Sequence, residues 1–282
     1  ALTTRLRAQN HYAAVHSVVL VSDEQAPASN AATRANIKAV LDKLAGRHAD
    51  VRHIANGHLL ERATPDDLVL ISFAGHGVST DGRFYLIPAD TGPGSGSGAD
   101  RRNTPELLAH AISSDELASW LRDVDAADLA MIIDACQSAA SVGQAFKPGP
   151  MGARGLGQLA YEKNMRILAA SQAEENAQES RLTQQGLLSY ALVNDGLEQA
   201  RADHLPADGK ITLSEWLTYA TRRVPDLAIE VAAGRLDEAD STARGAKRLG
   251  TPVQRNPILQ QPALFDFTRG RHDATVAATV AR

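Results

Sequence analysis

Two short apolar runs dominate the pattern of hydrophobic and polar positions along the chain. Residues 68–74 and 129–135 contain almost no periodic polar break, which is typical of strands buried on both faces of a parallel sheet. Residues 165–171 form a third run of this kind, and 263–267 predicts a closing strand. Strands that alternate with helices predict an α/β fold, a mostly parallel sheet with helices on both faces.

Helices are predicted where apolar residues recur at spacings of three and four. Two of them carry start signals: a serine cap at Ser113 or Ser114, and a capping box from Thr212 to Glu215. Elsewhere the pattern is weak: a strand is expected at 15–22, a hairpin arm at 83–88, and polar, glycine-rich loops at 91–100 and 138–157. The predicted helices cover 2–9, 33–44, 113–124, 186–201 and 212–224, and a polar, alanine-rich helix follows within 226–250.

Composition sets the broad class of the protein. The 282 residues carry a net charge of -4, which gives no global signal for nucleic acid or a membrane surface. No apolar stretch reaches 18 residues, and the N-terminus lacks the apolar core of a signal peptide. We expect one domain over 1–270, a disordered tail over 271–282, and a cytoplasmic location.

The only cysteine and one histidine follow the two principal strands. Gly75-His76-Gly77 closes the first run and Cys136 closes the second, so both side chains are predicted to emerge at the carboxyl edge of the sheet, where α/β proteins place their sites. A cysteine nucleophile needs a nearby base and donors for the oxyanion. His76 is a candidate base, and the amides of Gly77 and Cys136 are candidate donors.

The two motifs together resemble the caspase-like cysteine peptidases, in particular the metacaspase and bacterial orthocaspase branch. Phe73-Ala74-Gly75-His76-Gly77 and Ile133-Asp134-Ala135-Cys136-Gln137-Ser138 carry the resemblance, and the histidine lies 60 residues upstream of the cysteine, against roughly 50 in caspases. Residues 84–90, 165–171 and 264–267 resemble further strands of the family. The resemblance implies the caspase-hemoglobinase three-layer sandwich, and peptide hydrolysis with Cys136 as nucleophile and His76 as acid and base.

Asp134 bears on substrate specificity. Caspases carry glutamine two residues before the cysteine, whereas an aspartate at that position lines the S1 pocket in metacaspases. The resemblance therefore implies cleavage after arginine or lysine, and a carboxylate there suits a cationic side chain. The competing interpretation of Asp134 is a cap on the following turn. Ala74 stands where metacaspases often have serine, and Asp23 is a second, weaker candidate for an acidic pocket residue.

The family's sheet begins with a central strand, and the N-terminal pattern allows two registers for it. In the favoured one, 15–22 is the second strand and the central strand lies upstream of Ala1, so that an upstream segment completes the sheet. In the other, 15–22 is the first strand and 50–54 the second.

Caspase-like enzymes often cut themselves in the loop after the cysteine. Arg154 lies between glycines in that predicted loop and matches the basic residue expected before the cut bond. We therefore expect self-cleavage at Arg154, with Arg101 or Arg102 as second choices.

No metal or cofactor site is predicted. Asp208, Gly209 and Glu215 match the second half of a calcium loop, but His204 and Pro206 occupy positions that need carboxylates. Some metacaspases require calcium, which the sequence does not decide. The expected partner is a protein or peptide with a basic residue at P1. The alternative to an endopeptidase is a catalytically degenerate caspase-like module that acts as an interaction or scaffolding domain.

Overall fold

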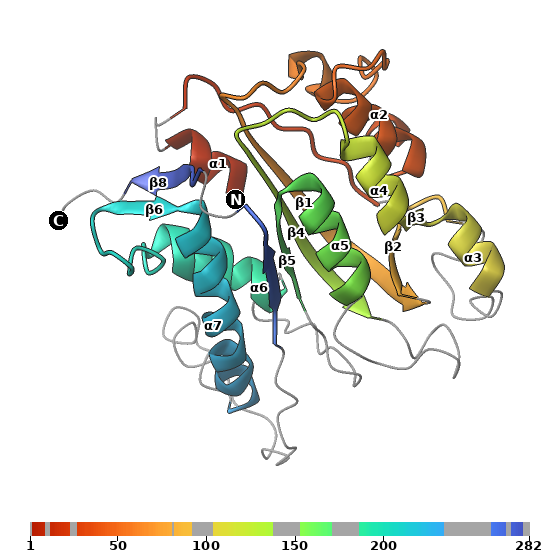
Figure 1. The fold of residues 1–282 in the computed structure, drawn as a ribbon. Coiled ribbons are helices and arrows are strands. Elements are labelled where there is room, and N and C mark those ends of the chain that lie inside the picture. The colour runs from red at the N-terminus through yellow and green to blue at the C-terminus, as the bar shows by residue number, and fades with distance from the viewer. Residues whose placement is uncertain are drawn as a thin grey trace.

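The computed structural model describes residues 2–8, 12–22, 27–80, 82–91, 104–137, 153–170, 186–233, 261–268 and 272–278. At the centre is a six-stranded sheet in the order β3-β2-β1-β4-β5-β7 (Figure 1). The central strands β1, β4 and β5 run parallel, and β2, β3 and β7 are antiparallel to their neighbours. The strands are β1 (Leu68–Thr80), β2 (Arg83–Ile87), β3 (Ile112–Ser113), β4 (Asp128–Gln137), β5 (Arg166–Ala169) and β7 (Ala263–Asp266).

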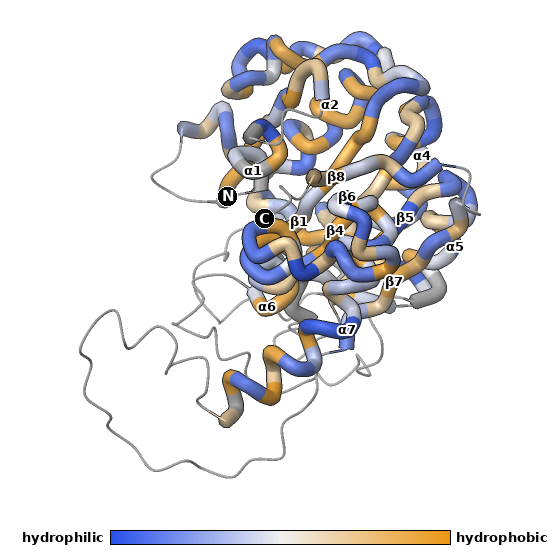
Figure 2. Tube along the Cα trace, turned by 90° about the vertical axis from the view of Figure 1, so that its left-hand side faces the viewer, coloured by the Kyte–Doolittle hydropathy of each residue, from blue (hydrophilic) through white to orange (hydrophobic). Residues whose placement is uncertain are grey.

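Helices cover both faces of this sheet, and each face has its own core. Because successive strand residues point to opposite faces, Met131 packs with α2, α4 and α5, whereas Ile132 packs with α6, η4 and α7. Figure 2 shows the hydrophobic stretches of β1 and β4 in the interior of the molecule. The α/β class is therefore confirmed. The helices are α1 (Leu2–Ala8), η1 (Ala28–Asn30), α2 (Arg34–Leu44), η2 (Gly57–Leu59), α3 (Thr104–His110), α4 (Ser114–Leu121), α5 (Ala153–Lys163), α6 (Leu187–Tyr190), the π-helix η4 (Ala191–Glu198) and α7 (Leu213–Ala232).

Both predicted helix caps are confirmed. Ser113 forms a capping box with Glu116 at the start of α4, and Thr212 forms one with Glu215 at the start of α7. The predicted end of the second helix near Val224 is wrong, because α7 continues through Pro225 to Ala232. A two-pronged ion pair between Arg223 and Glu230 spans the proline turn, with Nη1 2.7 Å from Oε1.

The two principal strands are longer than the apolar runs predict. β1 continues to Thr80 and β4 to Gln137, so neither Gly75-His76-Gly77 nor Cys136 lies in a turn. The physical reason is that residues 76–80 pair with β2, and the chain turns only at Gly82, whose φ of 75° suits glycine.

The first half of β1 has a strand neighbour on one side only. Among the described residues, 68–75 pair with β4, while the pairing with β2 begins at His76. Ser72 and Ala74 are exposed, whereas residues 128–133 of β4 are buried throughout. The prediction that this run is buried on both faces therefore fails for β1, because Ser72 and Ala74 lie on one face of the strand and are exposed.

The predicted strand at 15–22 is wrong. Residues 14–20 have no strand structure, Val21 makes only an isolated bridge to Ala31, and Val19 is 60% exposed. The alternative second strand at 50–54 is also absent, since a turn occupies this stretch. The strands that the two registers place within the chain are therefore absent, whereas the strand expected upstream of Ala1 lies outside the described residues. Adjacent valines without alternation did not suffice to define a strand.

The predicted tail contains a strand. Residues Thr275–Ala278 form β8, which pairs with β6 (Lys210–Thr212) in a second, two-stranded sheet. Val276 and Ala277 are buried in the same core as α7. Residues 275–278 are therefore part of the fold rather than a disordered tail, because their small apolar side chains fill space beside that helix.

Candidate active site

The strand register brings the two predicted catalytic positions together. His76 on β1 lies opposite Cys136 on β4, near the carboxyl ends of the parallel pair. Neighbouring strands are about 4.8 Å apart, so the two backbones are adjacent. The side chain of His76 is exposed, and the side chain of Cys136 lies outside the described part of the chain. The predicted juxtaposition is confirmed for the backbone.

Asp134 is a largely buried carboxylate beside these positions. It lies opposite Ala74 in the same register and two residues before Cys136, so residues 134 and 136 share a face of β4. Ser189 on α6 donates a hydrogen bond from Oγ to Oδ2 at 2.8 Å. Burial raises the pKa of Asp134, and hydrogen bonding from Ser189 opposes this rise in part. No lysine or arginine among the described residues forms an ion pair with this carboxylate.

Gly77, the predicted oxyanion donor, is flanked by strands on both sides. It lies opposite Leu86 on β2 and Gln137 on β4. A backbone N–H between two strands is normally used in the sheet's own hydrogen bonds. Donation from Gly77 to a substrate would therefore require one of these pairings to open.

The predicted cleavage residue belongs to a helix. The loop expected over 138–157 ends early, because α5 begins at Ala153 and includes Arg154. Gly155 allows α5 to pack closely, since a Cβ there would lie 2.9 Å from the backbone nitrogen of Phe84. The side chain of Arg154 lies outside the described residues, as do Arg101, Arg102 and Asp23 entirely.

Two residues near Asp134 were not identified by sequence reasoning. Ser189 was placed in a predicted helix without a role, and Gly186 was not considered as part of the site. Ser189 and Asp134 are 55 residues apart in the chain, and no spacing or motif links them. Only the packing of α6 against the end of β4 brings them into contact.

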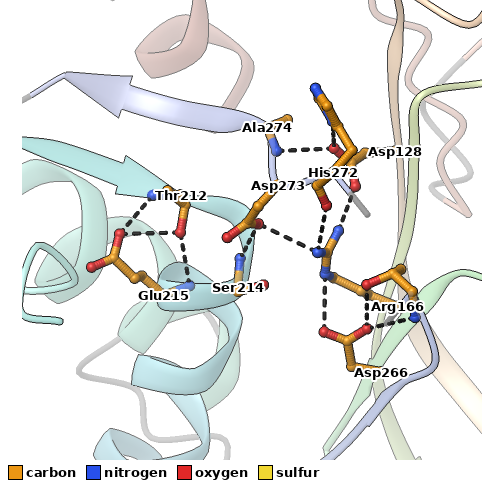
Figure 3. Close-up of polar contacts among 10 residues, drawn as sticks. Asp128, Arg166, Thr212, Ser214, Glu215, Asp266, His272, Asp273 and Ala274 are labelled. Atoms are coloured by element: carbon orange, nitrogen blue, oxygen red, sulfur yellow. Dashed lines mark hydrogen bonds and ion pairs between the residues drawn. The ribbon is translucent and has the colours of Figure 1, made fainter. Parts of the chain in front are cut away.

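A buried ionic network also includes an aspartate and a histidine, at the opposite end of β4 (Figure 3). His272 Nδ1 contacts Asp128, and the Arg166 guanidinium joins Asp128 to Asp266. Asp128 lies eight residues before Cys136 on the strand, a distance of roughly 26 Å at about 3.3 Å per residue. This pair therefore lies far from the candidate nucleophile.

The part of the chain that the structure describes has neither a metal cluster nor a membrane-spanning helix. In that part of the chain, no three or more histidine, cysteine, aspartate or glutamate side chains gather as a metal site. None of its helices is long and apolar enough to cross a membrane. Glu215, the last residue of the partial calcium loop, is used as a helix cap and also accepts a hydrogen bond from the Leu205 amide, 3.1 Å away.

Comparison with known proteins places the chain in a family. A family model described as the caspase domain, of peptidase family C14, matches residues 29–233, which is well over half of the chain. This range contains both principal strands, the candidate residues His76, Asp134 and Cys136, and helix α6. No curated protein matches the chain. The fold, the juxtaposed histidine and cysteine positions and the family match lead to one conclusion: the chain belongs to the caspase-domain family of cysteine peptidases.

Proposed function

We propose that the protein is a cysteine endopeptidase of the metacaspase or orthocaspase branch, which cleaves peptide bonds after arginine or lysine. The observation that carries the proposal is Asp134, a partly buried carboxylate on the same strand face as residue 136. Burying a charge without a partner is costly, and no cationic side chain of the described residues forms an ion pair with it. A cationic P1 side chain would supply the missing charge, and arginine could bind in a bidentate manner.

In this proposal Cys136 and His76 form the catalytic dyad. The cysteine thiolate attacks the scissile carbonyl carbon, and the amides of Gly77 and Cys136 stabilise the oxyanion once the strands around Gly77 have opened. The C–N bond then breaks, and His76 gives its proton to the leaving amine. Water, deprotonated by His76, hydrolyses the thioester and regenerates the cysteine.

The Asp134→Asn variant tests the proposed specificity. We expect kcat/KM for a peptide with arginine at P1 to fall about 100-fold, the size typical of removing one partner of a buried charge pair. The same peptide with citrulline, a neutral isostere of arginine, should be affected little, and a peptide with aspartate at P1 should resist the wild-type protein. Equal loss on the arginine and citrulline peptides would contradict a role of Asp134 in specificity.

The pH dependence supplies a second readout for the same carboxylate. Asp134 must be ionised to bind a cation, and burial raises its pKa above the ordinary aspartate value. The preference for arginine over citrulline should be complete at neutral pH. This preference should be lost as the pH falls through the raised pKa of Asp134. The loss should occur at a higher pH than it would for an exposed aspartate. A preference that does not change with pH down to about 4, the ordinary aspartate range, would exclude Asp134 as the recognition group.

The proposal extends to self-processing at Arg154. Because residue 154 is the second residue of α5 and proteases bind extended chains, the first turn of this helix must unwind before cleavage. We expect intact-mass analysis to show a cut after Arg154 in the wild type and none in Arg154→Gln or Cys136→Ala. The same cut in Cys136→Ala would assign it to another protease.

The proposal also includes an extended segment preceding residue 1 that completes the sheet. Among the described residues, 68–75 of β1 pair with a strand on one side only, which supports it, since unpaired strand edges readily accept another strand. In a longer chain, the amides of 68–75 should be better protected from hydrogen exchange than in residues 1–282. Equal exchange in both chains would reject this part of the proposal.

A further inference from the structure

The contact between β4 and α6 determines how Asp134 is held. Oδ2 of Asp134 accepts the hydrogen bond from Ser189 Oγ at 2.8 Å, and the Ser189 backbone also acts on the carboxylate. Both interactions lower the pKa of Asp134 and therefore favour its anionic form. Among the side chains of the described residues, that of Ser189 is the one that donates to this carboxylate.

Gly186 provides the space for this carboxylate. A Cβ at this position would lie 2.3 Å from Oδ2 of Asp134 and 2.9 Å from Oδ1, closer than any stable contact. The backbone of Gly186 has φ of -62° and ψ of 152°, which any residue can adopt. Glycine is therefore needed here for space rather than for conformation.

The same carboxylate lies at the start of a helix. Gly186 is the N-cap of α6 and has no side chain to cap it, whereas Ser189 is the third residue of that helix. Asp134 thus acts from β4 on the first turn of α6, which continues directly into the π-helix η4. Anions are stabilised at such helix starts. The Asp134 carboxylate would therefore both cap α6 and bind the P1 side chain.

We propose that Ser189 and Gly186 are positioning residues for P1 recognition, which hold the Asp134 carboxylate in the orientation that receives the substrate cation. This inference rests on the proposed function and adds to it the residues that determine how strongly arginine is preferred. Ser189 acts by its hydroxyl group, and Gly186 acts by leaving room. Neither residue is required to touch the reacting atoms.

The test measures the ratio of kcat/KM for two peptides that differ only by arginine or citrulline at P1. In Ser189→Ala the ratio should fall about tenfold, the size expected for one lost hydrogen bond to a charged group. The change should appear in KM for the arginine peptide, with kcat altered less than about twofold. Ser189→Thr keeps the hydroxyl and should recover most of the ratio.

Gly186→Ala should lower the same ratio by about tenfold or more, because the new methyl group displaces the carboxylate. Gly157→Ala is the matched control, since a Cβ there meets Phe265 at an ordinary 3.5 Å. Circular dichroism and the rate of Cys136 alkylation verify that each variant is folded with an intact dyad.

The outcomes distinguish a failure of this inference from a failure of the proposed function. A wild-type preference for arginine that depends on Asp134 but survives in Ser189→Ala overturns this inference and leaves the proposed function standing. A Ser189→Thr variant as weak as Ser189→Ala also overturns it, since the hydroxyl would then not be the acting group. A folded wild type with no preference for arginine overturns the proposed function and this inference with it.

Discussion

Replacing Cys136 with alanine is expected to reduce peptidase activity by about 10⁴-fold or more, because the chain has a single cysteine and the proposed reaction passes through its thioester. His76→Ala should cause a loss of similar order, since members of a catalytic pair act as a unit. The measurement is kcat/KM on a peptide with arginine at P1. His58→Ala is the matched control, because His58 is exposed and lies outside the site.

Alkylation distinguishes the endopeptidase from a degenerate interaction module. A thiol activated by His76 reacts quickly with iodoacetamide at neutral pH, and the reaction should slow in His76→Ala but not in His58→Ala. Slow labelling of the wild type, together with no turnover of basic peptides by the folded protein, would favour the module. In such a module, the pairing of Gly77 with the strands on both sides would stay closed.

Replacing Arg166 with alanine is expected to lower the free energy of unfolding by about 3–5 kcal/mol, as for other buried ion pairs that lose one partner. The side chains of Arg166 and Asp128 are each only 1% exposed. Arg166 also contacts Asp266, with Nε 3.2 Å from Oδ2, and the carbonyl of His272 at 3.0 Å (Figure 3). The variant leaves Asp128 buried without its cation.

Urea unfolding of the wild type and the variant measures this loss. Arg52→Ala is the control, because its ion pair with Asp50 is exposed, at 84% and 58% for the two side chains, and such pairs contribute at most about 1 kcal/mol. Activity per folded molecule should change little in Arg166→Ala, since the network lies at the far end of β4 from residue 136. A loss of stability below about 1 kcal/mol in Arg166→Ala would contradict this prediction, since the buried network would then contribute no more than an exposed pair.

Local sequence patterns sufficed for the elements that local chemistry controls. The two apolar runs became the central strands β1 and β4, and the capping boxes at Ser113 and Thr212 begin α4 and α7. The spacing of His76 and Cys136 after those runs placed both at the carboxyl edge, because parallel neighbours end together. These features depend on residues close in the chain.

Other predictions failed where contacts between distant segments decide the structure. Residues 275–278 looked like a disordered tail, but they bury Val276 beside α7. Residues 15–22 were expected to form a strand, but within the described part of the chain they make only the isolated bridge between Val21 and Ala31. The predicted loop gave way to α5 from Ala153, because Gly155 allows the helix to pack on β2.

For the site itself, the sequence alone determined which residues are candidates for the chemistry: a single cysteine, a histidine after the neighbouring apolar run, and an aspartate two residues before the cysteine. Only the tertiary structure decided how that aspartate is held. Ser189 and Gly186 reach Asp134 from α6, across 55 and 52 residues of chain, and no periodicity or motif records such a contact. The open edge of β1 is likewise a property of the assembled sheet, since a strand's own residues do not specify whether both of its neighbours are present.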